Sequence, residues 1–196
     1  DLEADDVDLR VVALAPDARA LLADLDVWTT IEAARVSPYR RMRVWDALAP
    51  GELTCDAAER GESALGWIVE NRLIQHALWQ AAHRPVSNDA ALRVCCPATI
   101  ADMSEDEDAI TAMLDDGTRL RARVLVAAEG AESPVRQRLG IAFDGRDYGQ
   151  RAVVAHVTTE RAHENTAWQR FMPGGPLAFL PLVDGRSSIV WSLPDE

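Results

Sequence analysis

The chain has 196 residues, of which 48% are hydrophobic and 27% charged, and its formal net charge at pH 7 is -12. This length can support one or two domains with a hydrophobic core, and the negative charge argues against nucleic-acid binding. All 20 basic residues are arginine, which excludes chemistry that needs lysine, such as Schiff-base catalysis. The three cysteines and four histidines show no metal-ligand spacing, so we predict no metal site and a reduced, cytoplasmic setting.

The first quarter of the chain predicts a strand, a helix and a pair of strands. An apolar stretch ends before Pro16, and a helical pattern follows in which Leu21, Leu22 and Leu25 form the expected buried stripe. Two β-strands are expected on either side of the Pro50-Gly51 turn.

A second helix and a β-rich stretch follow. Helical spacing begins at Asn71, which we predict to be the N-cap, and Pro85 marks the predicted end. From about residue 91 the pattern becomes β, with Asp116-Gly117 as a hairpin turn and the acidic residues 104–108 as a solvated loop tip.

A strand–turn–helix unit is predicted in the sequence VLVAAEGAESPVRQRLG. Residues 124–128 read as a strand covered on both faces, and Gly130 lies in the turn. Ser133 is the expected N-cap, Pro134 takes the first helical position, and Gly140 ends the helix. Such a turn lets an anionic ligand approach a helix N-terminus, but many units of this kind bind nothing, so both interpretations stay open.

The same segment resembles a known fingerprint. LVAAEGAESPVRQRLGI is similar to the second flavin motif, A-D-G-x-x-S-x-x-R, of the FAD-dependent aromatic hydroxylases (the para-hydroxybenzoate hydroxylase-like superfamily). Ala128, Gly130, Ser133 and Arg136 match the motif, whereas Glu129 replaces the usual aspartate. Four further stretches are similar to the branch that hydroxylates the ubiquinone precursor ring: DLRVVALAPDARALLADLDVW, LGWIVENRLIQHAL, YGQRAVVAHVTTERAHENTAWQRF and GPLAFLPLVDGRSSIVWSLP.

The resemblance implies an α/β (α+β) fold in which part of a Rossmann-like FAD-binding domain is interleaved with a β-sheet substrate domain. We expect residues 1–34 and 61–141 in the first and residues 35–60 and 142–196 in the second, because the chain is again β-rich past residue 141.

The function implied is a flavin-dependent monooxygenase that uses FAD, NAD(P)H and O₂ to hydroxylate a prenylated phenol or quinol in ubiquinone biosynthesis. Contact with the membrane surface, with other proteins of the same pathway or with a second copy of the chain is left open. The alternative is a non-catalytic module of the same fold that recognises a quinone or a protein partner.

Family matching also suggests which residues hold the cofactor. Arg10 is expected near the phosphate and ribityl part of FAD and Asn71 near the flavin, while the fingerprint contributes Glu129, Gly130, Ser133 and Arg136. Each has a simpler alternative: Arg10 as a surface arginine, Asn71 as a helix cap, Arg136 on a solvated helix face, and Glu129 as a partner of the helix dipole.

The substrate side is less defined. Phe179 and Pro181 are candidates for lining a ring-binding pocket, with core packing as the alternative, and no catalytic residue is identified. The chain carries neither a G-x-G-x-x-G motif after a first strand nor the family's closing Gly-Asp-Ala segment. We therefore expect an internal segment of a longer enzyme that is inactive by itself.

Overall fold

The computed structural model describes residues 7–84 and 92–195, which group into two compact units. The larger unit takes its described residues from 7–84 and 148–195, and the smaller unit takes them from 92–147. Helices and three sheets alternate along the chain, which confirms the predicted mixed α/β class.

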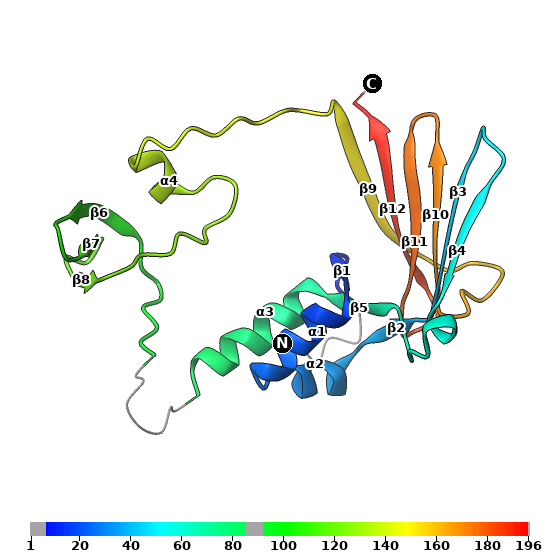
Figure 1. The fold of residues 1–196 in the computed structure, drawn as a ribbon, viewed down its shortest axis with the longest axis horizontal. Coiled ribbons are helices and arrows are strands. Elements are labelled where there is room, and N and C mark those ends of the chain that lie inside the picture. The colour runs from blue at the N-terminus through cyan, green and yellow to red at the C-terminus, as the bar shows by residue number, and fades with distance from the viewer. Residues whose placement is uncertain (1–6, 85–91, 196) are drawn as a thin grey trace. The chain divides into compact units, whose positions relative to one another are not determined.

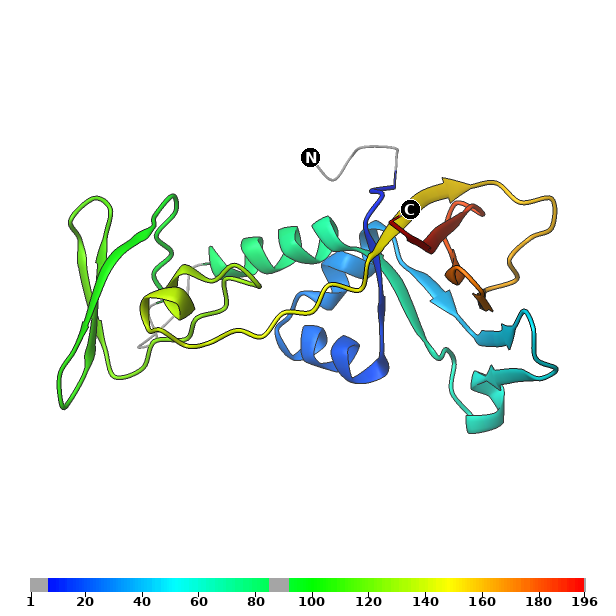
Figure 2. The same cartoon turned by 90° about the horizontal axis from the view of Figure 1, so that it is seen from above.

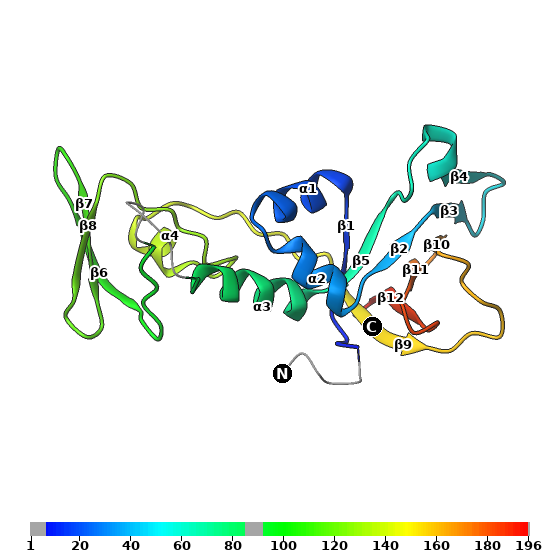
Figure 3. The ribbon, with the colours of Figure 1, turned by 90° about the horizontal axis from the view of Figure 1, so that it is seen from below.

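The larger unit begins with a small antiparallel sheet covered by helices (Figures 1 and 3). The strands in sheet order are β1 (Val11–Leu14), β5 (Gly66–Glu70) and β2 (Ser37–Tyr39). The helices are α1 (Pro16–Asp24), α2 (Trp28–Ala34) and α3 (Asn71–Ala82).

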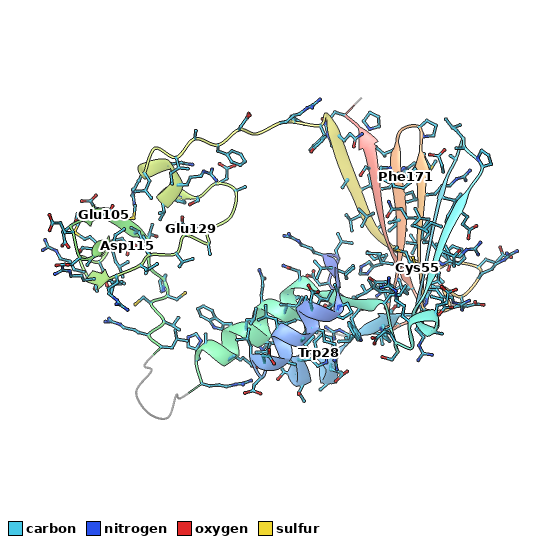
Figure 4. All side chains as sticks on the ribbon, viewed as in Figure 1. Trp28, Cys55, Glu105, Asp115, Glu129 and Phe171 are labelled. Atoms are coloured by element: carbon cyan, nitrogen blue, oxygen red, sulfur yellow. The ribbon has the colours of Figure 1, made fainter. Side chains whose placement is uncertain are left out.

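The central strand β5 is buried on both faces because successive side chains point to opposite sides of a sheet. Val69 belongs to a core with the helices, whose other buried members are Leu22, Val27, Trp28, Ile31, Leu73 and Ala77. Its neighbour Ile68 belongs to a second core with Val7 and Leu182. The labelled Trp28 lies among the side chains of the helical layer in Figure 4.

The predicted apolar stripe of the first helix is partly wrong. Leu22 is buried, but Leu21 and Leu25 are 59% and 50% exposed. The helix α1 has nine residues and ends before Leu25, which is its C-cap, and only Leu22 of the three leucines joins the core cluster of the helices. Pro16 does take the first helical position, as predicted.

A six-stranded sheet completes the larger unit (Figure 1). Its order is β4 (Glu52–Asp56), β3 (Arg41–Asp46), β10 (Thr166–Met172), β11 (Gly175–Pro181), β12 (Ser187–Pro194) and β9 (Gln150–Val157). The pair β3–β4 confirms the strands predicted around Pro50-Gly51, and β3 runs parallel to β10. All six strands come from residues 35–60 and 142–196, whose assignment to a substrate domain stays a prediction.

The smaller unit holds an antiparallel sheet and one short helix (Figure 2). The strands β6 (Ile100–Glu105), β7 (Ile110–Leu114) and β8 (Arg119–Ala122) are consecutive, and the helix is α4 (Pro134–Arg138). The predicted Asp116-Gly117 turn joins β7 to β8, and Gly117 has the positive φ of 83° that such a turn requires.

The strand predicted at residues 124–128 is wrong. This segment forms no strand, and Val124 and Val126 are 73% and 80% exposed. A buried strand needs a hydrogen-bonded neighbour and apolar cover, and the described residues supply neither here.

Candidate functional site

Two predicted cofactor residues, 61 positions apart in the sequence, meet at the end of the small sheet. In the antiparallel pair of β1 and β5, Val11 faces Glu70, and the next backbone N–H, that of Asn71, donates to the Arg10 carbonyl oxygen at 2.9 Å. Arg10 itself is exposed and Asn71 is half-buried. The structure therefore brings Arg10 and Asn71 side by side.

The N-cap prediction for Asn71 is wrong. Asn71 is the first residue of α3, and the cap position belongs to Glu70, whose side chain makes no capping bond. The Pro85 end of the helix lies outside the described residues. The cap prediction failed because the β5 strand runs directly into the helix and the Glu70 carboxylate is engaged elsewhere.

Glu70 is a carboxylate with only 2% of its surface exposed, and it holds the segment around Asp8 in place. It accepts hydrogen bonds from Arg35 Nε at 2.6 Å, from the Asp8 backbone N–H at 2.8 Å and from Arg72 Nε at 3.2 Å. Burial alone raises the pKa of this carboxyl, but its hydrogen bonds and the arginine charges outweigh burial, so the pKa lies below its ordinary value. The network fixes the backbone two residues before Arg10.

A cavity of about 370 Å³ lies between this anchored segment and the six-stranded sheet. Its lining is mostly apolar, and the residues that form it are Asp8, Leu9, Arg10, Val11, Val154, Ser188 and Val190. One wall is thus the chain leading into β1, and the other comes from β9 and β12. This size is within the usual range of small-molecule sites, about 300–1,000 Å³.

The predicted substrate residues lie on the other face of the sheet. Register pairs Phe179 with Ile189 and Pro181 with Ser187, so their side chains point away from the face of Ser188 and Val190. Phe179 and Pro181 therefore do not line this cavity. The sequence did not single out Val154, Ser188 and Val190. The alternation of side chains along a strand shows that the strand has two faces, but it does not show which face lines a cavity with the segment that leads into β1.

The bend before α4, residues 129–133, is held by hydrogen bonds from its own side chains. Ser133 is the N-cap, as predicted, and its Oγ accepts the Arg136 N–H at 3.1 Å. The Glu129 carboxylate, on the loop before α4 in Figure 4, accepts the Ser133 hydroxyl at 2.5 Å and the Val135 N–H at 3.2 Å. The φ of 90° at Gly130 explains the glycine there.

These contacts match the simpler interpretation of Glu129, in which its negative charge stabilises the N-terminus of α4. Because the N–H groups of Val135 and Arg136 are already satisfied, this terminus does not offer those two donors to an anion. The Arg136 side chain donates to the Ala131 carbonyl at 2.5 Å and lies 4.4 Å from the centre of the Phe143 ring. A role of the bend in cofactor binding stays a prediction.

Replacing Ser133 with alanine is expected to destabilise α4 by about 1 kcal/mol, because both the cap and the bond to Glu129 are lost. Backbone amides of residues 135–139 should then exchange with solvent about fivefold faster, measured by hydrogen exchange. Ser104→Ala on the exposed face of β6 is the control and should leave α4 unchanged. Equal exchange in both variants would contradict the cap.

Two absences apply to the described part of the chain. None of its helices is both long and apolar enough to span a membrane. Within the same residues, no three histidine, cysteine or acidic side chains gather where they could hold a metal ion.

The fold, with its covered small sheet, its larger sheet and a cavity between them, is shared with solved structures of FAD-dependent proteins. Residues 68–194 match the FAD binding domain family, and the chain belongs to this family. The resemblance proposed from the fingerprint is thereby confirmed at the family level.

Named relatives place the chain near the hydroxylases of ubiquinone biosynthesis. It is 38% identical to 3-demethoxyubiquinol 3-hydroxylase of Escherichia coli K12 over 94% of this chain and 46% of that protein. It is also 38% identical to the human ubiquinone biosynthesis monooxygenase COQ6, over 95% of this chain and 41% of the relative. The chain spans about half the length of the curated relatives that it matches.

Solved structures agree on the fold. PqsL, a probable FAD-dependent monooxygenase from Pseudomonas aeruginosa, superposes with a TM-score of 0.76 at 20% identity, over 94% of this chain and 50% of PqsL. Klebsiella pneumoniae HpxO in complex with FAD and uric acid gives a TM-score of 0.69 at 18% identity, over 97% of this chain and 48% of HpxO. At these identities the comparison establishes architecture alone.

Proposed function

We propose that the protein is a flavin-dependent monooxygenase that binds FAD and hydroxylates the ring of a prenylated phenol or quinol in ubiquinone biosynthesis. NAD(P)H would be the electron donor and O₂ the source of the oxygen atom. The observation that carries this proposal is the match of residues 68–194 to the FAD binding domain family, together with the names of the relatives that share 38% identity.

The cavity fits a cofactor or substrate with a flat apolar part and a charged part. Leu9, Val11 and Val190 offer apolar surface, and the exposed Arg10 guanidinium at the rim can balance a phosphate. Asn71 lies beside Arg10 and can hydrogen-bond a ring or ribityl oxygen. FAD supplies the redox chemistry when bound.

The residues of the chain supply binding, orientation and exclusion of water. The apolar residues that line the cavity keep water away from the ring of the bound ligand. The hydrogen bonds of Glu70 hold the segment that carries Arg10. We further propose that Glu129, Gly130, Ser133 and Arg136 support the cofactor through the shape of their bend. Residues 1–34 and 61–141 would then form the FAD-binding part, and 35–60 and 142–196 the substrate part.

The substrate class also suggests where the protein works. A prenylated ring is carried by the membrane, so we propose a cytoplasmic protein that meets its substrate at the membrane surface. Burial of the tail against apolar residues would add to its affinity.

The test uses the full-length protein. It should purify yellow, with the visible absorbance of bound flavin, and it should oxidise NAD(P)H faster when a prenylated phenol is added. Arg10→Ala should weaken FAD binding about tenfold, because one charge-assisted contact is lost, as followed by flavin fluorescence.

Arg60→Ala, an exposed arginine of the short helix η1 (Ala57–Arg60), is the matched control and should retain FAD fully. A full-length protein that purifies without colour would refute the proposed monooxygenase activity. It would favour a non-catalytic module that binds a quinone or a protein, a function consistent with the self-capped bend at Glu129.

A further inference from the structure

Asp8 brings a negative charge to the lining of the cavity. It is half-buried and lies two residues before Arg10, which lines the cavity as well. The backbone N–H of Asp8 donates to the Glu70 carboxylate at 2.8 Å, yet the Asp8 carboxylate makes no hydrogen bond or ion pair with any residue that the structure describes. The Glu70 network thus fixes the backbone of Asp8 and leaves its carboxylate available to a ligand.

Asp8 and Arg10 place opposite charges on the same wall of the cavity. Two residues of chain span at most about 7 Å, so the two side chains act on neighbouring parts of a ligand. A phosphate held by Arg10, as proposed above, would be repelled by a carboxylate this close. Asp8 therefore suits a neutral hydrogen-bond donor, because a charged carboxylate only accepts hydrogen bonds.

Two sources offer such a donor, the hydroxyl groups of the ribityl chain of the flavin and a hydroxyl on the substrate ring. The other lining residues distinguish them, because Leu9, Val11, Val154 and Val190 are all apolar. A ribityl chain carries a hydroxyl on most of its carbons, and its burial against apolar side chains is costly. A ring with one hydroxyl buries its carbons favourably there, so the lining favours a phenol.

We propose that Asp8 accepts a hydrogen bond from the hydroxyl of the substrate ring, with the ring carbons against Val154 and Val190. This inference rests on the proposed function and adds to it the residue that selects a ring with a hydroxyl. A hydrogen bond to a charged acceptor is about twice as strong as one between neutral groups. While the proton stays on the phenol, this bond raises the electron density of the oxygen and of the ring carbons ortho and para to it, where hydroxylation takes place.

The test compares two probes that differ only at the ring oxygen, 2-butylphenol and its methyl ether, 2-butylanisole. Their affinities for the full-length protein are measured by isothermal titration calorimetry. The wild type should bind the phenol about tenfold more tightly, because only the phenol donates a hydrogen bond to the carboxylate. Asp8→Asn keeps the size of the side chain and removes its charge, so the preference should fall to about twofold.

Asp24→Asn is the matched control. Asp24 is an exposed aspartate at the end of α1, in the same unit, and it is not among the residues that line the cavity. The variant undergoes the same change of charge and should keep the tenfold preference. A preference that survives Asp8→Asn, or that falls equally in Asp24→Asn, would overturn the proposal.

Thermal unfolding without probe separates a ligand contact from a structural role of the carboxylate. Asp8→Asn keeps the backbone N–H that Glu70 holds, and the charge that it removes has no partner among the described residues. The Tm should therefore stay within about 2 °C of the wild type. A larger fall that Asp24→Asn does not share would show that the carboxylate supports the fold, and would overturn the proposal.

Flavin absorbance and NAD(P)H oxidation in the same preparations keep the two claims apart. Asp8→Asn should retain FAD as the wild type does, and loss of FAD with an unchanged phenol preference would assign the carboxylate to the ribityl chain and overturn the proposal. A colourless protein that still shows the Asp8-dependent preference refutes the monooxygenase and leaves the Asp8 contact standing. A yellow, active protein whose phenol preference does not depend on Asp8 refutes the contact alone.

Discussion

Glu70→Leu is expected to lower the free energy of unfolding by about 3 kcal/mol, because it removes a buried carboxylate from two arginines and a backbone N–H. Arg35 would remain largely buried, with 20% of its side chain exposed and the carboxylate gone. The variant should also release Asp8 and thus the segment that leads to Arg10. Urea unfolding followed by tryptophan fluorescence gives the change in free energy.

The control is a second glutamate–arginine pair in the same unit. Glu52 pairs with Arg43 on the six-stranded sheet, where both side chains are more than a third exposed. Glu52→Leu should therefore change the stability far less than Glu70→Leu, since solvent screens an exposed pair. Similar losses for both variants would show that burial of Glu70 is not what makes its network important.

The same carboxylate predicts a dependence of stability on pH. Its folded pKa lies below the unfolded value, which is about 4.3 for glutamate, so its contribution is present in full above that pH. The contribution is lost as the pH falls through the folded pKa. The difference in unfolding free energy between wild type and Glu70→Gln should be constant near neutral pH and shrink below about pH 4.

Gly66→Ala is the second large effect, and we expect it to cost about 3 kcal/mol of stability. A Cβ at Gly66 would lie 2.5 Å from the Leu14 carbonyl oxygen and 2.6 Å from the Tyr39 hydroxyl. The backbone of β1 would have to move, and β1 carries one wall of the cavity.

Gly174→Ala provides the comparison for this change. Its Cβ would meet only the side chain of Pro194, at an ordinary 3.7 Å. Urea unfolding of the two variants should thus differ by about 2 kcal/mol or more. A Gly66→Ala protein as stable as Gly174→Ala would mean that the small sheet adapts to the extra methyl group at no cost.

Local sequence patterns determined where several helices and strands of this protein form. Helical spacing predicted α3, and the chain was predicted to be β-rich past residue 141, where β9 to β12 lie; Pro16 and Ser133 marked helix starts that the structure confirms. These features depend on neighbours within a few residues, so the chain encodes them locally. The fingerprint around Gly130 likewise pointed to the flavoprotein family to which the chain belongs.

Long-range packing decided the rest. Glu70 was not singled out in the sequence, because Arg35 and Asp8 meet it from 35 and 62 positions away. The apolar run at residues 124–128 predicted a covered strand that the described residues do not pair. The cavity wall shows the same limit, since residues 8–11 line the cavity together with one face of β12, and the alternation along β12 does not say which face that is. Register and burial are properties of several segments at once, so no single stretch of sequence contains them.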